Sequence, residues 1–404
     1  MYESLIFLIF LFIFCYFASA QNGVVIEQEF VKKGCNSTCI YREDRISSKT
    51  ISNFPKNCST LCGYFVIDDL TDLSEKQLIS LFENAKILIG GLTIFDTNYT
   101  TGSFLSGLEA IDCMYDSVVE WVSNMKMTES GLTNLKNISC NDFTISDSSK
   151  MTKLNMPKFE NYQGTNNLVI SRLASDFCMS GDEIKGFLTT TTVPANVEIS
   201  GKLCDFVKND KSCTKDVSDG CTDFYGDLTI GPNFSDLEKL KSLETIIGTL
   251  FLNATNFIDL SIFENLHYII QIDQKKSALK VEGNEMLNSA LFPSLKRIFS
   301  TSPLESVIFK NNHENLKNDP MTCYKIRNSV MPSSLWVPDF DDISCEDMKV
   351  VNTPAPETPA VTQVLGNPIV TPPPGHSETC TDNSEGNIWN SKPILLISLF
   401  SCIF

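Results

Sequence analysis

The sequence predicts a β-solenoid that contains two copies of one domain, because the middle of the chain repeats itself. Residues Ile89–Ile111 align without a gap with Ile247–Ile269 at an offset of 158, and eight of the 23 aligned positions are identical. A second ungapped match, at an offset of 136, joins Phe143–Phe159 to Leu279–Leu295. Two matches in the same order indicate a duplicated domain of roughly 150 residues, which is a common domain size.

Short strand-like triplets recur within each copy. Each triplet has apolar residues on both sides of a central residue, a pattern that suits a strand with one buried face. The first copy has Phe65–Ile67, Leu92–Ile94, Phe143–Ile145 and Leu168–Ile170, and the second has Leu228–Ile230, Leu250–Leu252, Leu279–Val281 and Val307–Phe309. The spacings are 27, 51 and 25 residues in the first copy and 22, 29 and 28 in the second. Periods of about 20 to 30 residues indicate stacked coils, each burying its apolar face on the next.

One spacing departs from this period. The step of 51 residues in the first copy corresponds to 29 in the second, which predicts an insertion of 22 residues. Cys113 and Cys140 bracket this stretch and have no counterpart in the second copy. We therefore expect a disulfide that closes the insert.

A family resemblance rests on motifs that both copies share in the same order. They are Ile-Gly-x-Leu-x-[Ile/Leu], then Leu-x-x-Ile, then Pro-x-[Phe/Leu]. Together they resemble the receptor L domain, the ligand-binding module of insulin-receptor and EGF-receptor ectodomains. In particular the chain is similar to nematode proteins that carry two such domains without a kinase. The resemblance covers about Cys35 to Cys345, most of the mature chain.

The resemblance implies the finer fold. Each L domain would be a right-handed β-helix related to leucine-rich repeats, with short parallel sheets, short helices and disulfide-closed ends. The expected bounds are 35–190 for the first domain and 201–345 for the second. The chain departs from the receptors between Cys178 and Cys221, where four cysteines are too few for the furin-like cysteine-rich module that separates their L domains.

The cysteine count suits an oxidising compartment. Of the 15 cysteines, Cys15, Cys380 and Cys402 lie in the terminal segments, and twelve remain between Cys35 and Cys345, enough for six disulfides. The repeat places Cys178 where Cys323 stands, each shortly after the last triplet of its copy. We therefore expect equivalent end bridges, and the expected pairs are Cys178–Cys204, Cys323–Cys345, Cys113–Cys140 and Cys213–Cys221.

Four cysteines near the start of the first copy leave their partners open. Cys35 and Cys39 are expected to pair with Cys58 and Cys62, in an order that the sequence does not fix. Two Cys-x3-Cys pairs also allow a zinc site on spacing alone. In a secreted chain the disulfide interpretation is favoured.

The N-terminal residues 1–20 have the pattern of a secretory signal peptide. Leu5–Phe17 is an apolar run apart from Cys15 and Tyr16, and Ala18–Ala20 provides a small-x-small cleavage site. The run is short for a membrane span, which disfavours the alternative of an uncleaved signal anchor.

The C-terminal segment predicts a stalk and a lipid-attachment signal. Residues 350–383 are rich in Pro and Thr and predict an extended stalk. Residues 384–404 combine small residues, a polar spacer and the apolar tail Pro393–Phe404, which matches a glycosylphosphatidylinositol signal. Ser384 is the best-placed acceptor, with Asn383 and Gly386 next. The alternatives are a merely hydrophobic terminus or an atypical tail anchor.

Composition and motifs argue against nucleic-acid binding and catalysis. The net charge is −17 with no basic run, which argues against a nucleic-acid partner. None of the three histidines stands in a metal or triad pattern, and no hydrolase, P-loop or kinase motif occurs. We expect no enzyme activity, no cofactor and no metal. Six N-glycosylation sequons instead indicate exposed loops of a secreted chain: Asn36, Asn57, Asn98, Asn137, Asn233 and Asn253.

The central residues of the triplets predict the binding face. Strand alternation points them outward, between the buried positions, and they are Thr93, Thr144, Thr229, Phe251 and Lys280. By resemblance, the chain would be a cell-surface or secreted protein that binds an extracellular polypeptide or modulates an insulin-type or EGF-type receptor. The alternative from another class is a cell-adhesion or extracellular coat protein. A solvated strand face is the plain structural interpretation of the same residues.

Overall fold

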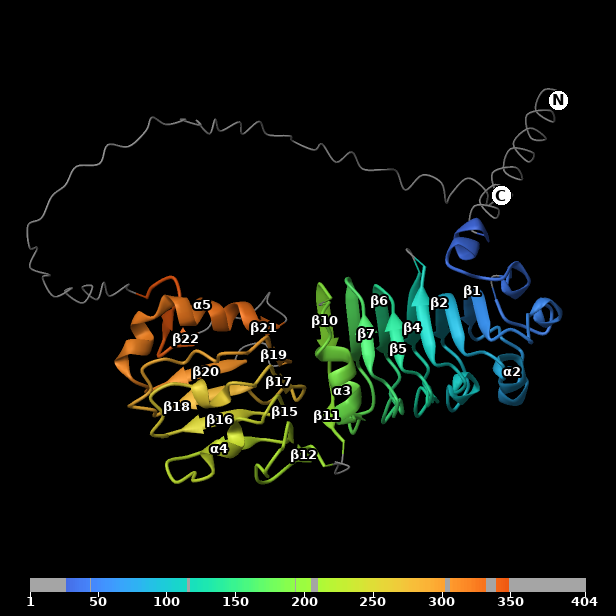
Figure 1. The fold of residues 1–404 in the computed structure, drawn as a ribbon. Helices are drawn as coiled ribbons and strands as arrows, with labels where there is room; N and C mark the ends of the chain where they lie inside the picture. Colours follow the sequence, from blue (N-terminus) through green and yellow to red (C-terminus); the bar gives the residue numbers. More distant parts are fainter. Residues whose placement is uncertain are drawn as a thin grey trace, which may run out of the picture. The chain divides into compact units, whose positions relative to one another are not determined.

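The structure is a computed structural model that describes residues 27–43, 45–114, 117–192, 194–204, 210–301, 306–331 and 339–348 (Figure 1). The expected signal peptide, stalk and attachment signal, with Ser384 and Cys380, lie outside these residues. Within the part of the chain that is described, no helix is long and apolar enough to cross a membrane.

The first copy forms one nine-stranded parallel sheet. Its order is β10-β8-β6-β4-β2-β3-β5-β7, and β1 also pairs with β2. The strands are β1 (Thr60–Ile67), β2 (Ile87–Phe95), β3 (Ala110–Cys113), β4 (Val118–Val122), β5 (Asn137–Ser139), β6 (Asp142–Ser146), β7 (Asn161–Gln163), β8 (Asn167–Ser171) and β10 (Asn196–Ile199). A two-stranded sheet of β9 (Cys178–Met179) and β11 (Lys202–Leu203) follows. Both β10 and β11 lie beyond residue 190, the expected end of the first domain.

The second copy forms two six-stranded sheets, separate from the first. One sheet, which we call the inner sheet, contains β12 (Ser212–Cys213), β13 (Asp223–Tyr225), β15 (Thr245–Ile247), β17 (Tyr268–Gln271), β19 (Arg297–Ser300) and β21 (Val330–Met331). The other, the outer sheet, contains β14 (Leu228–Ile230), β16 (Leu250–Asn253), β18 (Leu279–Glu282), β20 (Val307–Lys310), β22 (Asp339–Phe340) and β23 (Ile343–Ser344). Only the β22–β23 pair is antiparallel among the described strand pairs. All eight expected triplets lie in strands.

Short helices connect the strands. The α-helices are α2 (Glu75–Phe82), α3 (Gly181–Leu188), α4 (Leu237–Leu240) and α5 (Pro320–Ser329), and the 3₁₀ turns are η1 (Ser37–Cys39), η2 (Ile51–Asn53), η3 (Ser103–Leu105), η4 (Ser261–Phe263) and η5 (Glu314–Asn318). Capping explains where α3 begins: the Ser180 hydroxyl accepts from the Glu183 N–H while the Glu183 carboxylate accepts from the Ser180 N–H.

The predicted insertion in the first copy is a complete additional coil. Strand β4 pairs with β2 on one side and β6 on the other, so the step of 51 residues contains a strand that the triplet search missed. Val119 and Trp121 of β4 are fully buried around Glu120. The disulfide between Cys113 and Cys140 joins neighbouring coils, because β3 pairs with β5.

A repeated corner ends the strands of both copies. The first residue past the strand has a positive φ, as at Asp96 (50°), Asp147 (54°), Ala254 (50°) and Asn311 (54°). In six corners the next residue is polar: Thr97, Asn124, Ser148, Thr255, Asn284 and Asn312. These side chains bond from one coil to the next. The Asn124 Oδ1 accepts from the Thr97 N–H (3.1 Å) and hydroxyl (2.7 Å), and the Asn284 Oδ1 accepts from the Thr255 N–H (2.8 Å) and hydroxyl (2.7 Å).

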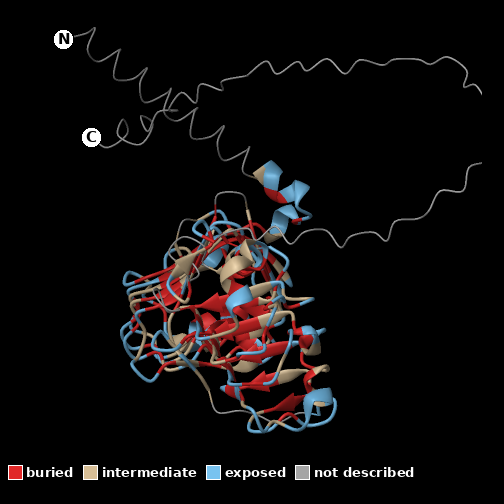
Figure 2. Cartoon of the chain, turned by 90° about the vertical axis from the view of Figure 1, so that its left-hand side faces the viewer, coloured by how far each residue is buried: buried red, intermediate tan, exposed pale blue. Residues whose placement is uncertain are grey.

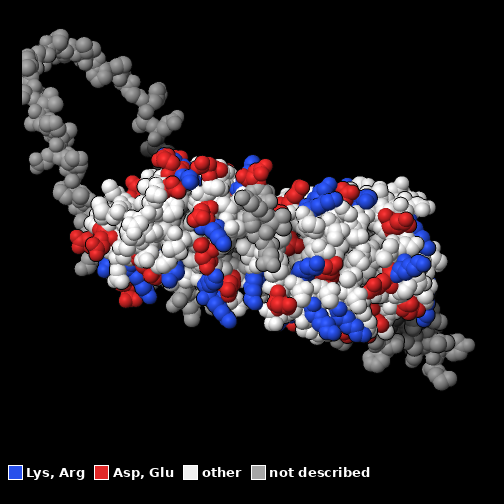
Figure 3. All heavy atoms as spheres, turned by 90° about the horizontal axis from the view of Figure 1, so that it is seen from below, with Lys and Arg blue, Asp and Glu red and all other residues white. Residues whose placement is uncertain are grey.

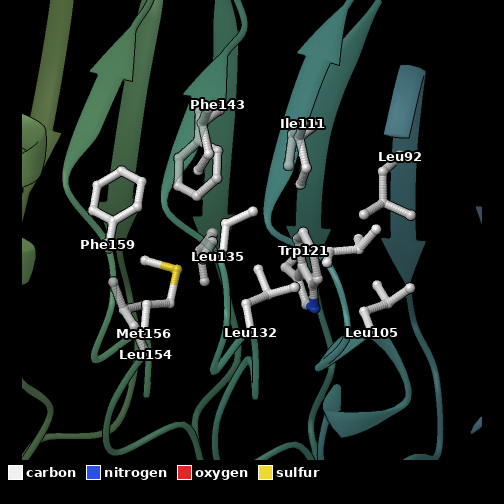
Figure 4. Close-up of a cluster of buried hydrophobic side chains, with 14 of the residues drawn as sticks. Leu92, Leu105, Ile111, Trp121, Leu132, Leu135, Phe143, Leu154, Met156 and Phe159 are labelled. Carbon is white, nitrogen blue, oxygen red and sulfur yellow. The ribbon is translucent and has the colours of Figure 1, made fainter. Parts of the chain in front are cut away.

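Leucine, isoleucine and aromatic residues form the buried core of each copy. Figure 2 shows in red that many strand residues are buried. Figure 4 shows Leu92, Ile111 and Trp121 from neighbouring strands pointing into one interior. Burial of these apolar faces stabilises stacked coils, because no single coil can bury its apolar face alone.

Six disulfides are present, four within the first copy and two within the second. They are Cys35–Cys62, Cys39–Cys58, Cys113–Cys140, Cys178–Cys204, Cys213–Cys221 and Cys323–Cys345. The four pairs named from the sequence are among them. For the four cysteines whose partners the sequence left open, the structure has Cys35 bonded to Cys62 and Cys39 to Cys58. These two disulfides use the four sulfur atoms that a zinc site would need.

Candidate binding surfaces

The nine-stranded sheet of the first copy presents an outward row of side chains. Register aligns Val66, Thr93, Glu120, Thr144, Val169 and Glu198 across six strands. Thr93 and Thr144 are half-buried, and Glu120 of the additional coil stands between them. The two threonines are therefore two coils apart in a row that carries carboxylates.

An apolar area adjoins this row at the β1–β2 end. Tyr64 is 40% exposed and Phe95 is 46% exposed. The Tyr64 ring lies over Gly91, where a Cβ atom would come within 3.1 Å of it, and its edge meets Phe30 at a centroid distance of 5.7 Å. Gly91 thus leaves room for an aromatic ring held by its neighbours. We call Tyr64, Val66, Thr93 and Phe95 the aromatic end of the first sheet.

The other three expected residues form a second row, in the outer sheet of the second copy. Register aligns Thr229 with Phe251 and Phe251 with Lys280. The Lys280 ammonium lies over the Phe251 ring, 4.8 Å from its centroid, and pairs with Glu282 at 3.5 Å. The five residues therefore form two rows in two separate sheets and not one continuous surface.

The inner sheet of the second copy is not open to a partner. Its outward side chains Tyr225, Ile247, Ile270 and Phe299 are buried in the same apolar cluster as the core of the first copy. A Cβ atom on Gly181 would meet the Tyr225 ring at 1.9 Å, which shows how closely the ring packs on α3.

Polar contacts reinforce this junction between the two copies. Arg297 donates to the carbonyls of Leu188 (2.5 Å) and Thr190 (3.2 Å), and the Tyr268 hydroxyl donates to the carbonyl of Thr189 (3.1 Å). These carbonyls lie at the C-terminal end of α3, where a cation is favoured. Partial burial lowers the pKa of the Arg297 guanidinium.

Several ionisable groups in the described residues bond to the backbone or pair with each other. Asp68 pairs with Arg45 at 2.7 Å and accepts from the Leu70 N–H, and the Nδ1 of His313 accepts from the Asn315 N–H. Within the described ranges, no cluster of three His, Cys, Asp or Glu side chains is suited to a metal ion. Figure 3 shows Lys and Arg interspersed with Asp and Glu on the face in view.

The six sequon asparagines are all exposed. Two of them lie on strands and four lie in the connections between elements. Asn137 lies on β5 and Asn253 on β16, whereas Asn36, Asn57, Asn98 and Asn233 lie in connections. Cys58, inside the Asn57 sequon, is bonded to Cys39.

Sequence reasoning missed the aromatic end and the Glu120 position. Tyr64 and Phe95 lie one position outside their triplets, and strand alternation extended by two residues would have found them. Glu120 lies in Val118–Val122, which also alternates but has a charged residue at its centre.

Comparison with known proteins agrees with the duplicated architecture. The family model described as the receptor L domain matches residues 57–151 and 220–328. These two regions contain the aligned segments Ile89–Ile111 and Ile247–Ile269, and the first region ends within Phe143–Phe159. No curated protein matches the chain.

Proposed function

Because the chain belongs to the receptor L domain family, we propose that it is a non-enzymatic extracellular protein that binds a polypeptide. The ligand would be an insulin-like or EGF-like peptide, or the ectodomain of a receptor of that class. The observation that carries the proposal is the outward face of the first sheet. It combines the exposed aromatic rings of Tyr64 and Phe95 with half-buried threonines and carboxylates. Aromatic side chains within a polar surround are typical of protein-binding surfaces.

We infer further that each copy winds as a right-handed β-helix. Successive parallel strands of one sheet need a crossover connection, and such connections are right-handed in nearly all proteins. The domain bounds that fit this interpretation are about 35–204 and 210–348, because β11 and Cys204 belong to the first copy.

The ends of the chain complete the proposal. A signal peptide at residues 1–20 would direct secretion, and attachment of a lipid at Ser384 would hold the stalk on the outer face of the plasma membrane. Six disulfides suit this oxidising route. Phosphatidylinositol-specific phospholipase C should release the full chain from intact cells, and replacement of residues 384–404 by a stop codon should send it to the medium. Retention on the cell after phospholipase treatment would contradict the anchor.

Capture of a soluble peptide tests the binding function. We would immobilise the secreted ectodomain and measure its binding of insulin-like and EGF-like peptides. Thr93→Glu with Thr144→Glu should reduce capture by at least tenfold, because both carboxylates would join Glu120 in one row. Gln163→Glu, on β7 of the same sheet, is the matched control and should leave capture unchanged.

Two other outcomes would replace the proposal. Unchanged capture by a properly secreted double variant would remove the first sheet from consideration. Aggregation of beads coated with the ectodomain, without capture of any soluble peptide, would instead support the adhesion alternative.

A further inference from the structure

Asn253 stands on the same outward face as Phe251. Along β16, Leu250 and Leu252 are buried, Phe251 is half-buried and Asn253 is exposed. Strand alternation therefore points Phe251 and Asn253 to the same side, about 7 Å apart along the strand. Among the described residues, the Asn253 side chain has no hydrogen-bond partner, so the fold assigns it no structural role.

The two copies diverge at this position. The duplication aligns Asn253 with Phe95 and Thr255 with Thr97. Both threonines bond to the asparagine of the next coil, so the corner itself explains Thr255. What changes is the outward residue before the corner: the first copy exposes an aromatic ring and the second places an acceptor asparagine in Asn-Ala-Thr.

The surroundings of Asn253 suit a sugar that lies back on the Phe251 ring. Ala254, with φ of 50°, turns the chain directly after Asn253, and both residues are exposed. The Lys280 ammonium lies over the Phe251 ring. On the neighbouring strand β14, the residue paired with Phe251 is the short, exposed Thr229. The C–H face of a pyranose is apolar and packs on aromatic rings as other apolar groups do.

We propose that Asn253 carries an N-linked glycan whose first sugar packs on Phe251 and covers the outer-sheet row. In the transfer, the Nδ2 of Asn253 bonds to the anomeric carbon of a lipid-diphosphate-linked oligosaccharide. The bond from that carbon to the diphosphate breaks, the amide loses one proton and the lipid diphosphate leaves. Transfer acts on the extended chain, before the corner buries Thr255.

This inference rests on the proposed function and narrows it. A glycan over Phe251 removes Thr229, Phe251 and Lys280 from the surfaces that a polypeptide can reach. The strands β2, β4, β6, β8 and β10 of the first sheet carry no sequon. Partner binding would then fall on the outward row that these strands of the first sheet form, and the outer-sheet row of the second copy would be covered by sugar.

Glycopeptide mass spectrometry tests the attachment. The full chain would be secreted from eukaryotic cells and digested with trypsin, and residues 242–275 form one peptide in which Asn253 is the only sequon. Most of this peptide should carry a glycan, and Asn253→Gln should abolish it. An unmodified peptide would overturn the proposal.

A thermal cycle tests the packing on the ring. Enzymatic removal of the glycan should lower the Tm of the wild type more than that of Phe251→Ala, because only the wild type loses the sugar–ring contact. Equal shifts in both proteins would refute packing on Phe251.

Binding measurements separate this inference from the proposed function. Phe251→Glu on the glycosylated chain should capture the peptide ligand as the wild type does, and a loss of at least tenfold would contradict the covering role. The peptide map and the thermal cycle need no ligand. The glycan can therefore fail while binding at Thr93 stands, and binding can fail while the glycan stands.

Discussion

Ala254 adopts a left-handed backbone conformation that suits glycine better. Its φ is 50°, and the equivalent corner one coil later holds Gly283 at 68°. The left-handed conformation costs an alanine about 1–2 kcal/mol, and glycine would lose part of that gain through unfolded-chain entropy. Ala254→Gly should therefore raise the free energy of unfolding by about 0.5–1 kcal/mol, measured by denaturant titration of the deglycosylated protein.

The control for Ala254→Gly is the same exchange at Ala195, an exposed alanine without a positive φ. Ala195→Gly should lower stability, because glycine adds only unfolded-state entropy there. Equal effects at both sites would show that the corner does not strain Ala254.

Glu183 gives the second residue-level prediction. Burial raises its pKa, although its carboxylate accepts from the N–H groups of Met156 and Ser180. A carboxyl with a raised folded-state pKa favours folding below its unfolded pKa, about 4.3, and this contribution is lost as pH rises through the folded pKa. The stability of the wild type relative to Glu183→Gln should thus be greater at pH 4 than at pH 7.

Thermal unfolding at both pH values checks this expectation. Glu160→Gln, at an exposed neighbouring carboxylate, controls for the loss of one charge. A wild-type advantage that grows from pH 4 to pH 7 would contradict the assigned effect of burial.

At the level of the strands, the sequence predicted those that recur as triplets in both copies. The motif around Leu92–Ile94 repeats around Leu250–Leu252, and alternation alone identifies both strands. It did not identify β4, because the additional coil that contains the buried Val119 and Trp121 has no counterpart in the second copy. The strand pairing identifies β4, because β4 lies between β2 and β6 in the sheet and pairs with both.

The two outward rows, in the first sheet and in the outer sheet, could likewise be predicted only in part from the sequence. Alternation places Thr93 and Phe251 on the opposite side of their strands from the buried residues, as the structure does. Only the strand pairing in the structure reveals that the two residues lie in different sheets. The burial of Ile247 and Phe299 likewise depends on contact between the two copies, which local sequence does not encode.

The corner asparagines predict a large loss of stability on truncation. Asn124 is fully buried, accepts from Thr97 and donates to the carbonyls of Ile94 (2.8 Å) and Val122 (3.2 Å). Asn124→Ala would leave several of these buried groups without partners and should cost about 2–4 kcal/mol in denaturant unfolding. The exposed Asn166→Ala should change stability by less than about 0.5 kcal/mol. A comparably small effect at Asn124 would show that the corner bonds are dispensable.

At the level of the whole molecule, the junction between the copies predicts cooperative unfolding. Tyr225 packs on Gly181, and Arg297 donates to the carbonyls at the end of α3. Calorimetry of the wild type should show a single transition, and Tyr225→Ala with Arg297→Ala should separate it into two. The fluorescence of Trp121, buried in the first copy, should follow only one of the two.

Arg327→Ala is the control for loss of an arginine from the second copy. Arg327 pairs with Glu346 at the surface, and such pairs contribute little. The control should retain one transition. Two transitions in the wild type would mean that the copies unfold independently despite their contact.

The additional coil around β4 has a consequence for how this chain changes over evolutionary time. A coil meets only the coils above and below it, so one can be gained or lost while both disulfide-closed ends remain as they are. Descendants of a common ancestor should then differ in length by whole steps, near the 24 and 27 residues that separate Val119 from Phe143 and from Leu92. The number of coils in such a domain would change only by whole coils. Smaller insertions and deletions would be confined to the connections at its surface.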